Sequence, residues 1–185
     1  MVPEAPLQES GSGLAPTGAG WFVVNAREAM WLTTDGGEKQ RSGSECCFET
    51  PMAEFEQMGV RLHVLPPGEP NGCYHAETQQ EDFLVLAGEC RLLVEGEERV
   101  LRQWDFFHSP ADTEHIFVGA GEEPCVILMV GSRTAGGGIR YPVSELAARY
   151  GASVAAETAE PDDAYADWEP SRRERPSYWD RLPWA

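Results

Sequence analysis

The sequence predicts an all-β fold, either a barrel or a sandwich, for the central part of the chain. Short runs rich in β-branched and aromatic residues recur there, turn residues separate them, and no helical pattern lies between them. The runs expected as strands are 62–65, 73–77, 82–87, 91–95, 98–102, 105–108, 115–118 and 125–130. Two earlier runs, 21–24 and 46–49, are also strand-like.

Length and composition exclude several classes of protein. The chain has 185 residues and is 42% hydrophobic, which fits one domain with a core and appendages. With 31 acidic and 14 basic residues its net charge is −17, so binding to nucleic acid or to an anionic membrane surface is disfavoured. The sequence contains neither an apolar run of the ~18 residues needed to span a bilayer nor a secretory signal, and we expect a cytoplasmic protein.

The cysteines agree with a reducing compartment. There are five, at positions 46, 47, 73, 90 and 125, and no C-x-x-C pair indicates a zinc ribbon or a redox couple. We therefore expect reduced, mostly buried thiols.

Three segments are expected along the chain. Residues 1–18, rich in Gly, Pro, Ser and Ala, are predicted to form a flexible arm, and residues 19–140 the barrel. Residues 33–44, which include Lys39, are expected as an exposed loop. Residues 141–185 are expected to contain a short helix over 142–151, with Pro142 near its start and Gly151 as its stop, followed by an extended tail.

The tail has few aliphatic residues but several large aromatic ones. Trp168, Tyr178, Trp179 and Trp184 cannot build a core of their own, so the tail is either disordered or docked on the barrel or on a second subunit. Because uncovered sheet edges invite pairing with another chain, and residues 21–24 would suit such an edge, we expect a homodimer.

The chemically most informative residues lie between positions 75 and 115. His75 and Glu77 are two apart on an expected strand, so their side chains point to the same face, and Glu81 follows at a turn. His115 comes after a further hairpin. A barrel can bring these two imidazoles and two carboxylates together in one cup, where they would suit divalent Fe, Mn, Ni, Co or Zn.

The stretch from about residue 68 to residue 119 resembles the paired motifs of the cupin superfamily, G-x5-H-x-H-x3,4-E-x6-G and G-x5-P-x-G-x2-H-x3-N. The matching positions are His75, Glu81, Gly88, Pro110 and His115. The departures are Glu77 in place of the second histidine, Gly68 one residue too far upstream, Asp112 for the inner glycine, Gly119 for the asparagine, and Trp104 or Asp105 for the first glycine of the second motif.

This resemblance implies a double-stranded β-helix, the jelly-roll barrel of the RmlC-like proteins, holding one divalent metal ion. We take His75, Glu77, Glu81 and His115 as the predicted ligands and leave open Fe, Mn, Zn or Ni as the ion. If Glu77 does not ligate, two histidines and one carboxylate remain, the arrangement used by non-haem iron oxygenases.

The resemblance leaves several functions open, because cupins have many activities. The leading hypothesis is a metal-dependent, dioxygenase-like oxidoreductase acting on a small organic molecule. The alternatives are a non-catalytic cupin that binds a small ligand with a structural metal or none, and a sugar isomerase or epimerase. The sugar isomerase or epimerase hypothesis is weakened because arginines such as Arg61 and Arg91 are expected in hairpins facing solvent. No cluster of cationic side chains that would bind the phosphate of a phosphosugar is then evident. His63 and His108 lie outside the motifs, and we expect structural roles for both.

Overall fold

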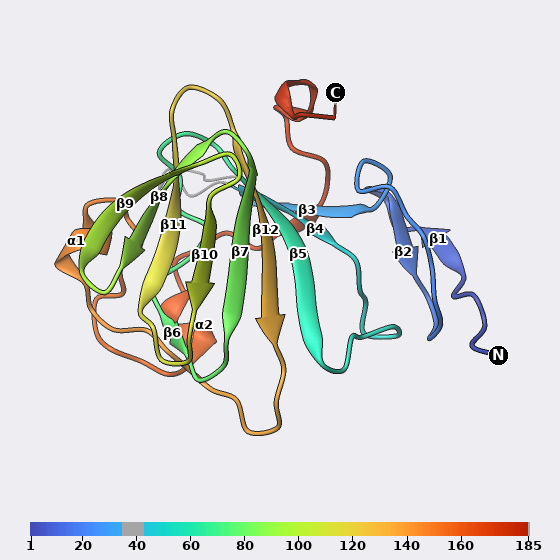
Figure 1. Cartoon of the computed structure of the whole chain (residues 1–185), viewed down its shortest axis with the longest axis horizontal. Helices are drawn as coiled ribbons and strands as arrows, with labels where there is room; N and C mark the ends of the chain where they lie inside the picture. Colours follow the sequence, from blue (N-terminus) through green and yellow to red (C-terminus); the bar gives the residue numbers. More distant parts are fainter. Residues whose placement is uncertain (35–42, 185) are drawn as a thin grey trace.

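The computed structural model describes residues 1–34 and 43–184, and most of its strands belong to two antiparallel sheets (Figure 1). Within these residues the larger sheet has seven strands in the order β10-β7-β12-β5-β4-β3-β14, and a second sheet has three in the order β11-β8-β9. The larger sheet consists of β3 (Met30–Thr34), β4 (Gly43–Cys47), β5 (Met58–Leu65), β7 (Glu81–Ala87), β10 (Phe106–Ser109), β12 (Cys125–Ser132) and β14 (Arg172–Arg173). The second sheet consists of β8 (Glu89–Val94), β9 (Glu97–Arg102) and β11 (His115–Ala120).

The core lies between the two sheets because alternate residues of each strand face inward. Its buried members are Leu65, Phe83, Val85, Cys90, Leu92, Phe117, Cys125 and Ile127. Gly88 makes the turn from β7 to β8 with a φ of +72°, and a Cβ at this position would lie 2.6 Å from the Pro124 carbonyl oxygen. The predicted all-β fold and most of the predicted strands are therefore confirmed.

Small elements complete one end of the barrel. β6 (Ala76–Glu77) pairs with β13 (Ile139–Arg140), so the predicted strand over 73–77 is shorter than expected. The expected helix over 142–151 contains α1 (Glu145–Ala148), whose N-cap residue Ser144 accepts a hydrogen bond from the Ala147 amide. No helix within 1–34 and 43–184 is long and apolar enough to cross a membrane.

The N-terminal segment differs from the expected loose arm. β1 (Leu7–Glu9) and β2 (Leu14–Pro16) form an antiparallel hairpin, and the Gly- and Ser-rich residues between them make its turn. Ser12 in this turn is buried, where its hydroxyl donates to the Trp31 carbonyl at 2.6 Å. The predicted strand over 21–24 is wrong, because only Trp21 pairs there, in an isolated bridge with Glu4.

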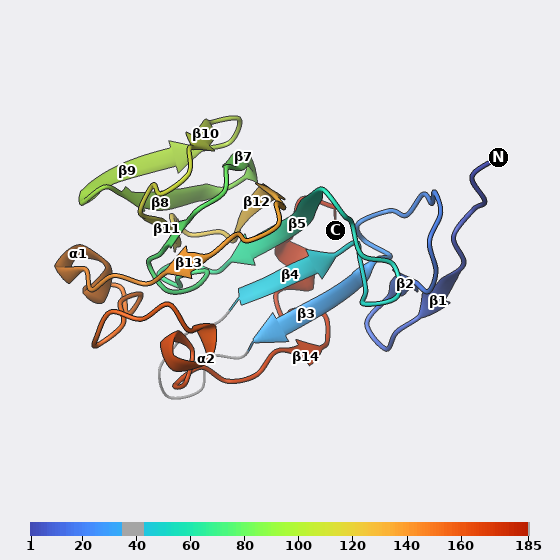
Figure 2. The ribbon, with the colours of Figure 1, turned by 90° about the horizontal axis from the view of Figure 1, so that it is seen from below.

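The tail is docked on its own barrel, which was one of the two alternatives. This C-terminal arm, residues 152–184, contains α2 (Pro161–Ala164), β14 and a 3-10 helix (Trp179–Arg181). Figure 2 shows the arm running beneath the sheet to β14, which pairs with β3 through Arg172↔Thr33 and Arg173↔Leu32. The arm thus covers in cis an edge that a partner would otherwise pair with, and the homodimer stays a prediction.

The predicted exposed loop over 33–44 is only partly described. Thr33 and Thr34 end β3, while Gly43 and Ser44 begin β4, and both Thr33 and Ser44 are buried. The remainder, including Lys39, lies outside the described residues.

Candidate metal centre

His75 and His115 lie side by side on neighbouring backbone segments. The His75 amide donates to the His115 carbonyl at 3.1 Å, and the His115 amide donates to the His75 carbonyl at 2.8 Å. Because the two residues form an antiparallel pair, their side chains project from the same face. Their ring centroids are 4.9 Å apart.

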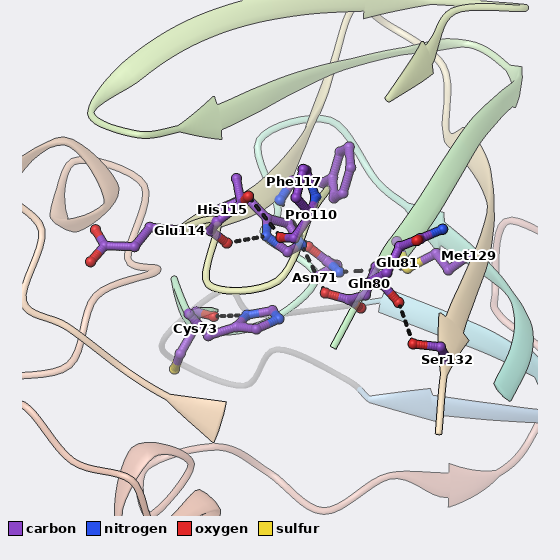
Figure 3. A network of polar contacts seen from close by, with 12 residues as sticks. Asn71, Cys73, Gln80, Glu81, Pro110, Glu114, His115, Phe117, Met129 and Ser132 are labelled. Carbon is purple, nitrogen blue, oxygen red and sulfur yellow. Dashed lines mark hydrogen bonds and ion pairs between the residues drawn. The ribbon is translucent and has the colours of Figure 1, made fainter. Parts of the chain in front are cut away.

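Both imidazoles have a hydrogen bond that fixes which nitrogen carries the proton. His75 Nδ1 lies 2.8 Å from the Cys73 carbonyl oxygen, and His115 Nδ1 lies 3.0 Å from the Thr113 carbonyl oxygen (Figure 3). A carbonyl only accepts, so each Nδ1 donates and each Nε2 of the neutral ring keeps its lone pair. Burial lowers the pKa of His115 to about 4, with His75 adding to the effect, and it also lowers the pKa of His75.

Glu81, at the start of β7, completes the cluster. Its Oε2 lies 3.4 Å from His115 Nε2 and has no hydrogen-bond partner among the described residues, although the atom is buried. Ligand atoms of His75, Glu81 and His115 all lie within 4.8 Å of one another. Burial raises the pKa of Glu81 to about 8, and the carboxylate of Glu77 adds to this rise.

Glu77 lies next to this cluster but is not part of it. Its backbone pairs with Ile139 of β13, and its carbonyl accepts a hydrogen bond from the Asp112 amide at 2.7 Å. The side chain lines the same cavity as His75 and Glu81, as period-two alternation predicts. Its carboxylate, however, is outside the group whose ligand atoms lie within 4.8 Å of one another.

These residues fit a divalent metal ion. Two imidazole nitrogens with free lone pairs and one carboxylate oxygen suit Fe, Mn, Zn or Ni, and the two Nδ1–H groups bonded to carbonyls orient the rings as metal-bound histidines are oriented. A cation would also satisfy the buried Glu81 Oε2, which otherwise lacks a partner within residues 1–34 and 43–184.

An inner cavity of about 410 Å³ opens onto this cluster, and an outer cavity of about 480 Å³ adjoins it. The two share Arg61, His63, Asn71 and Tyr165 as lining residues. Arg61 was expected in a hairpin facing solvent. Its side chain is exposed, but it lies in β5 and lines both cavities. The signal was the i, i+2 spacing of Arg61, His63 and Leu65, which places all three on one face of a strand.

The cationic side chains at the cavities are paired with carboxylates. Arg61 Nη1 donates to Glu45 Oε2 at 2.9 Å, and Arg133 donates to both oxygens of Glu49 at 2.8 and 2.6 Å. Burial alone would raise the pKa of Glu45, but His63 and Arg61 outweigh it and lower that pKa to about 2. The charge of each of these two arginines is therefore neutralised, and neither offers an unpaired cation to an anionic ligand in the cavity.

Asn71 is a cavity residue that sequence reasoning missed. Its Oδ1 accepts from the Phe117 amide at 3.0 Å, which fixes the amide plane, and its Nδ2 lies 3.9 Å from the Met129 sulfur (Figure 3). A sulfur is a weak acceptor, so this N–H₂ group can still donate to a bound molecule.

Other candidate residues have structural roles. His108 Nδ1 contacts Asp82 Oδ1 at 2.6 Å on the outside, as expected for a histidine outside the motifs. The five cysteines are buried thiols, as predicted. Cys73 donates from Sγ to the Ala164 carbonyl at 3.4 Å and therefore contacts the C-terminal arm.

Two of the departures from the second cupin motif keep a glycine-like backbone. Asp112 has a φ of +65° and Trp104 a φ of +76°, in the left-handed region that glycine adopts most readily. Asp tolerates this region better than most residues, so the turn before His115 forms without the glycine.

Comparison with known proteins agrees with this architecture. Residues 61–131 match the cupin domain family. Among solved structures, a predicted oxalate decarboxylase from Thermotoga maritima has a TM-score of 0.53 at 17% identity, covering 61% of this chain and 100% of its own. A cupin-superfamily sugar phosphate isomerase from Silicibacter pomeroyi has a TM-score of 0.46 at 26% identity, covering 52% of this chain.

A third structure, an RmlC-like cupin from Shewanella frigidimarina, has a TM-score of 0.43 at 18% identity over 51% of this chain and 78% of its own. The chain spans 63% of the Silicibacter structure's length. No curated protein matches the sequence. The chain thus contains a region, residues 61–131, that matches the cupin domain family, and its barrel has the fold of the Thermotoga structure.

Proposed function

We propose that this cupin binds one divalent metal ion through His75, Glu81 and His115 and acts with it on a small organic molecule. The observation that carries the proposal is Glu81 Oε2, a buried carboxylate oxygen that lacks a hydrogen-bond partner among the described residues and faces two imidazoles. A buried carboxylate in such a position needs a cation or donors to compensate its desolvation.

The arrangement supports a catalytic metal better than a structural one. Structural sites are usually closed by four protein ligands, whereas here the cluster has three, and two of them, His75 and Glu81, line a cavity of about 410 Å³ that can admit a molecule. A bound divalent ion would supply Lewis acidity and, if it is iron, the redox chemistry that two-histidine, one-carboxylate oxygenases use. Oxygenase chemistry is therefore the reaction class that we propose.

The chain's own residues provide the remaining functions. The Cys73 and Thr113 carbonyls hold the two imidazoles in one tautomer. Glu77, on the cavity wall beside the cluster, is the carboxylate placed to accept a proton from a bound substrate. The Asn71 amide can donate a hydrogen bond to a substrate oxygen.

The first test concerns the histidines. The His75→Ala/His115→Ala double variant should lose bound divalent metal, measured by elemental analysis after purification without a nickel-affinity tag. Its far-UV circular dichroism should remain that of a β protein, because the apolar residues of the core are unchanged. His108→Ala, which removes an exposed imidazole, is the matched control and should keep its metal. Full metal occupancy in the double variant would disprove the assignment.

The second test concerns Glu77. If it stays outside the coordination sphere, Glu77→His should leave metal content and preference unchanged. If it reaches the ion, the same substitution should shift the preference toward nitrogen-favouring Ni and Cu. Competition titrations with Zn, Ni and Mn on both proteins separate the two outcomes.

A further inference from the structure

The metal cluster lies at one end of a longer cavity. Arg61, His63, Asn71 and Tyr165 line both the inner and the outer cavity, so the two spaces meet at these residues. Their volumes, about 410 and 480 Å³, are each within the range of small-molecule sites. A molecule bound at the cluster can therefore extend into the outer cavity.

One wall of this cavity is aromatic along its length. Tyr141 has its ring centroid 6.0 Å from that of His75, Tyr165 lies 5.7 Å from Tyr141, and Trp168 lies 5.3 Å from Tyr165. Tyr141 and Tyr165 line the inner cavity, and Tyr165 and Trp168 line the outer one. Tyr165 and Trp168 belong to the C-terminal arm, far from the cupin motifs in sequence.

The barrel is shaped to hold this part of the arm. A Cβ at position 72 would lie 2.7 Å from the Tyr165 hydroxyl oxygen, so Gly72 leaves the space that this hydroxyl occupies. The hydroxyl accepts a hydrogen bond from the Cys73 amide at 3.3 Å. A fixed aromatic surface loses little conformational entropy when a ligand packs on it.

The other lining residues do not favour a strongly charged ligand. The charge of Arg61 is neutralised by Glu45 at 2.9 Å. Leu32, Leu65 and the acidic residue Glu169 also line the outer cavity. A neutral, planar body suits these surroundings better than a phosphate or a second carboxylate, which would meet no unpaired cation among the described lining residues.

We propose that Tyr165 and Trp168 determine specificity for an elongated aromatic compound. Its oxygen-bearing end lies at the His75, Glu81 and His115 cluster, and its ring packs on the aromatic wall in the outer cavity. This inference rests on the proposed metal site and adds to it the substrate class and the two residues that select it.

Two hydroxamates test the inference on the full-length, zinc-loaded protein by isothermal titration calorimetry. Acetohydroxamate chelates zinc without a ring, and 3-phenylpropanohydroxamate adds a ring on a short linker. The aromatic compound should bind about tenfold more tightly or better. Trp168→Ala and Tyr165→Leu should each reduce this advantage to about threefold or less and leave acetohydroxamate affinity unchanged, while Trp168→Phe should restore most of the advantage.

The control is Trp21→Ala, which removes an exposed indole that lines neither cavity and should keep the full advantage. Equal affinities of the wild type for the two hydroxamates would overturn the inference and leave the metal site intact, as would an advantage that survives in both Trp168→Ala and Tyr165→Leu. Failure of the protein to bind any of Fe, Mn, Zn and Ni, or failure of the metal-loaded protein to bind acetohydroxamate, would overturn the proposed function, and the inference with it.

Discussion

The motif-bearing region, residues 61–131, and the C-terminal arm, residues 152–184, obtain their structure in different ways. In the first, most strands pair with other strands of the same region, such as β7 with β12 and β8 with β11. In the second, α2 and β14 have four and two residues, and the arm is held by contacts with distant parts of the chain. Thr33 Oγ1, for example, donates to the Glu174 carbonyl at 2.7 Å.

The difference has a consequence for function. The candidate metal cluster consists of residues from the motif-bearing region alone, whereas the cavities beside it are also lined by residues from the rest of the chain. Here the arm supplies Tyr165 and Trp168 to the cavities and covers the β3 edge. The barrel and the arm are thus expected to respond differently to the changes below.

The largest effect is expected from truncation after Gly151. This removes Leu182, Tyr178, Trp179 and Trp184 from the outer face of the sheet, where they pack around Trp31 and Leu62. Each large apolar side chain that is buried contributes about 1.5–3 kcal/mol, so the loss approaches the whole stability of a domain of ~5–15 kcal/mol. We expect a lower melting temperature or association into larger species, measured by calorimetry and light scattering. A truncated chain as soluble and stable as the full one would show that the arm is dispensable.

A single substitution at Trp31, against which the arm packs, should reduce stability by less than the truncation does. Trp31 is fully buried and has its indole N–H bonded to the Ala26 carbonyl at 2.9 Å. Trp31→Ala should lower the free energy of unfolding by about 3–5 kcal/mol. Urea denaturation of this variant beside Trp104→Ala, which truncates an exposed indole, measures the difference. Equal losses of unfolding free energy in the two variants would contradict a stabilising role of the buried Trp31 side chain.

The smallest effect on stability is expected from Glu45, which lines the outer cavity, and this effect depends on pH. The pKa of Glu45 is lowered from 4.5 to about 2, so its stabilising contribution is complete above pH 4.5 and is lost as the pH falls from 4.5 toward 2. Near pH 6, the free energy of unfolding of the wild type should exceed that of Glu45→Gln by up to about 3 kcal/mol. This difference should disappear on acidification. Denaturation series at several pH values test this, with the exposed Glu56→Gln as the control. A gap that does not change with pH would contradict it.

Much of the motif-bearing region could be predicted from sequence. The recurring β-rich runs predicted most of the strands, and the cupin motifs identified His75, Glu81 and His115, which the structure brings together. The position of the Glu77 carboxylate outside their group was not predictable, because it depends on contacts of its backbone with Ile139 and Asp112, which lie far along the chain.

The arm and the N-terminal hairpin were harder to predict for a related reason. Short strands such as β14 have no periodicity to detect, since two residues acquire their conformation from the edge that they pair with. Composition alone gave residues 10–13 as part of a loose segment, although glycine and serine suit a tight turn equally well. Arg61 was misplaced because its i, i+2 relation to His63 was not used.

The indole rings that pack between the arm and the barrel also allow the docked state of the arm to be followed by circular dichroism. Trp31 has its ring centroid 5.3 Å from that of Trp179, at 86°, and 5.4 Å from that of Trp184, at 42°. Chromophores this close, in a fixed chiral arrangement, couple their electronic transitions and give a paired near-ultraviolet dichroism band. That band exists only while the arm is in place, so the chain carries a built-in spectroscopic reporter, and detachment of the arm can be followed without any added label.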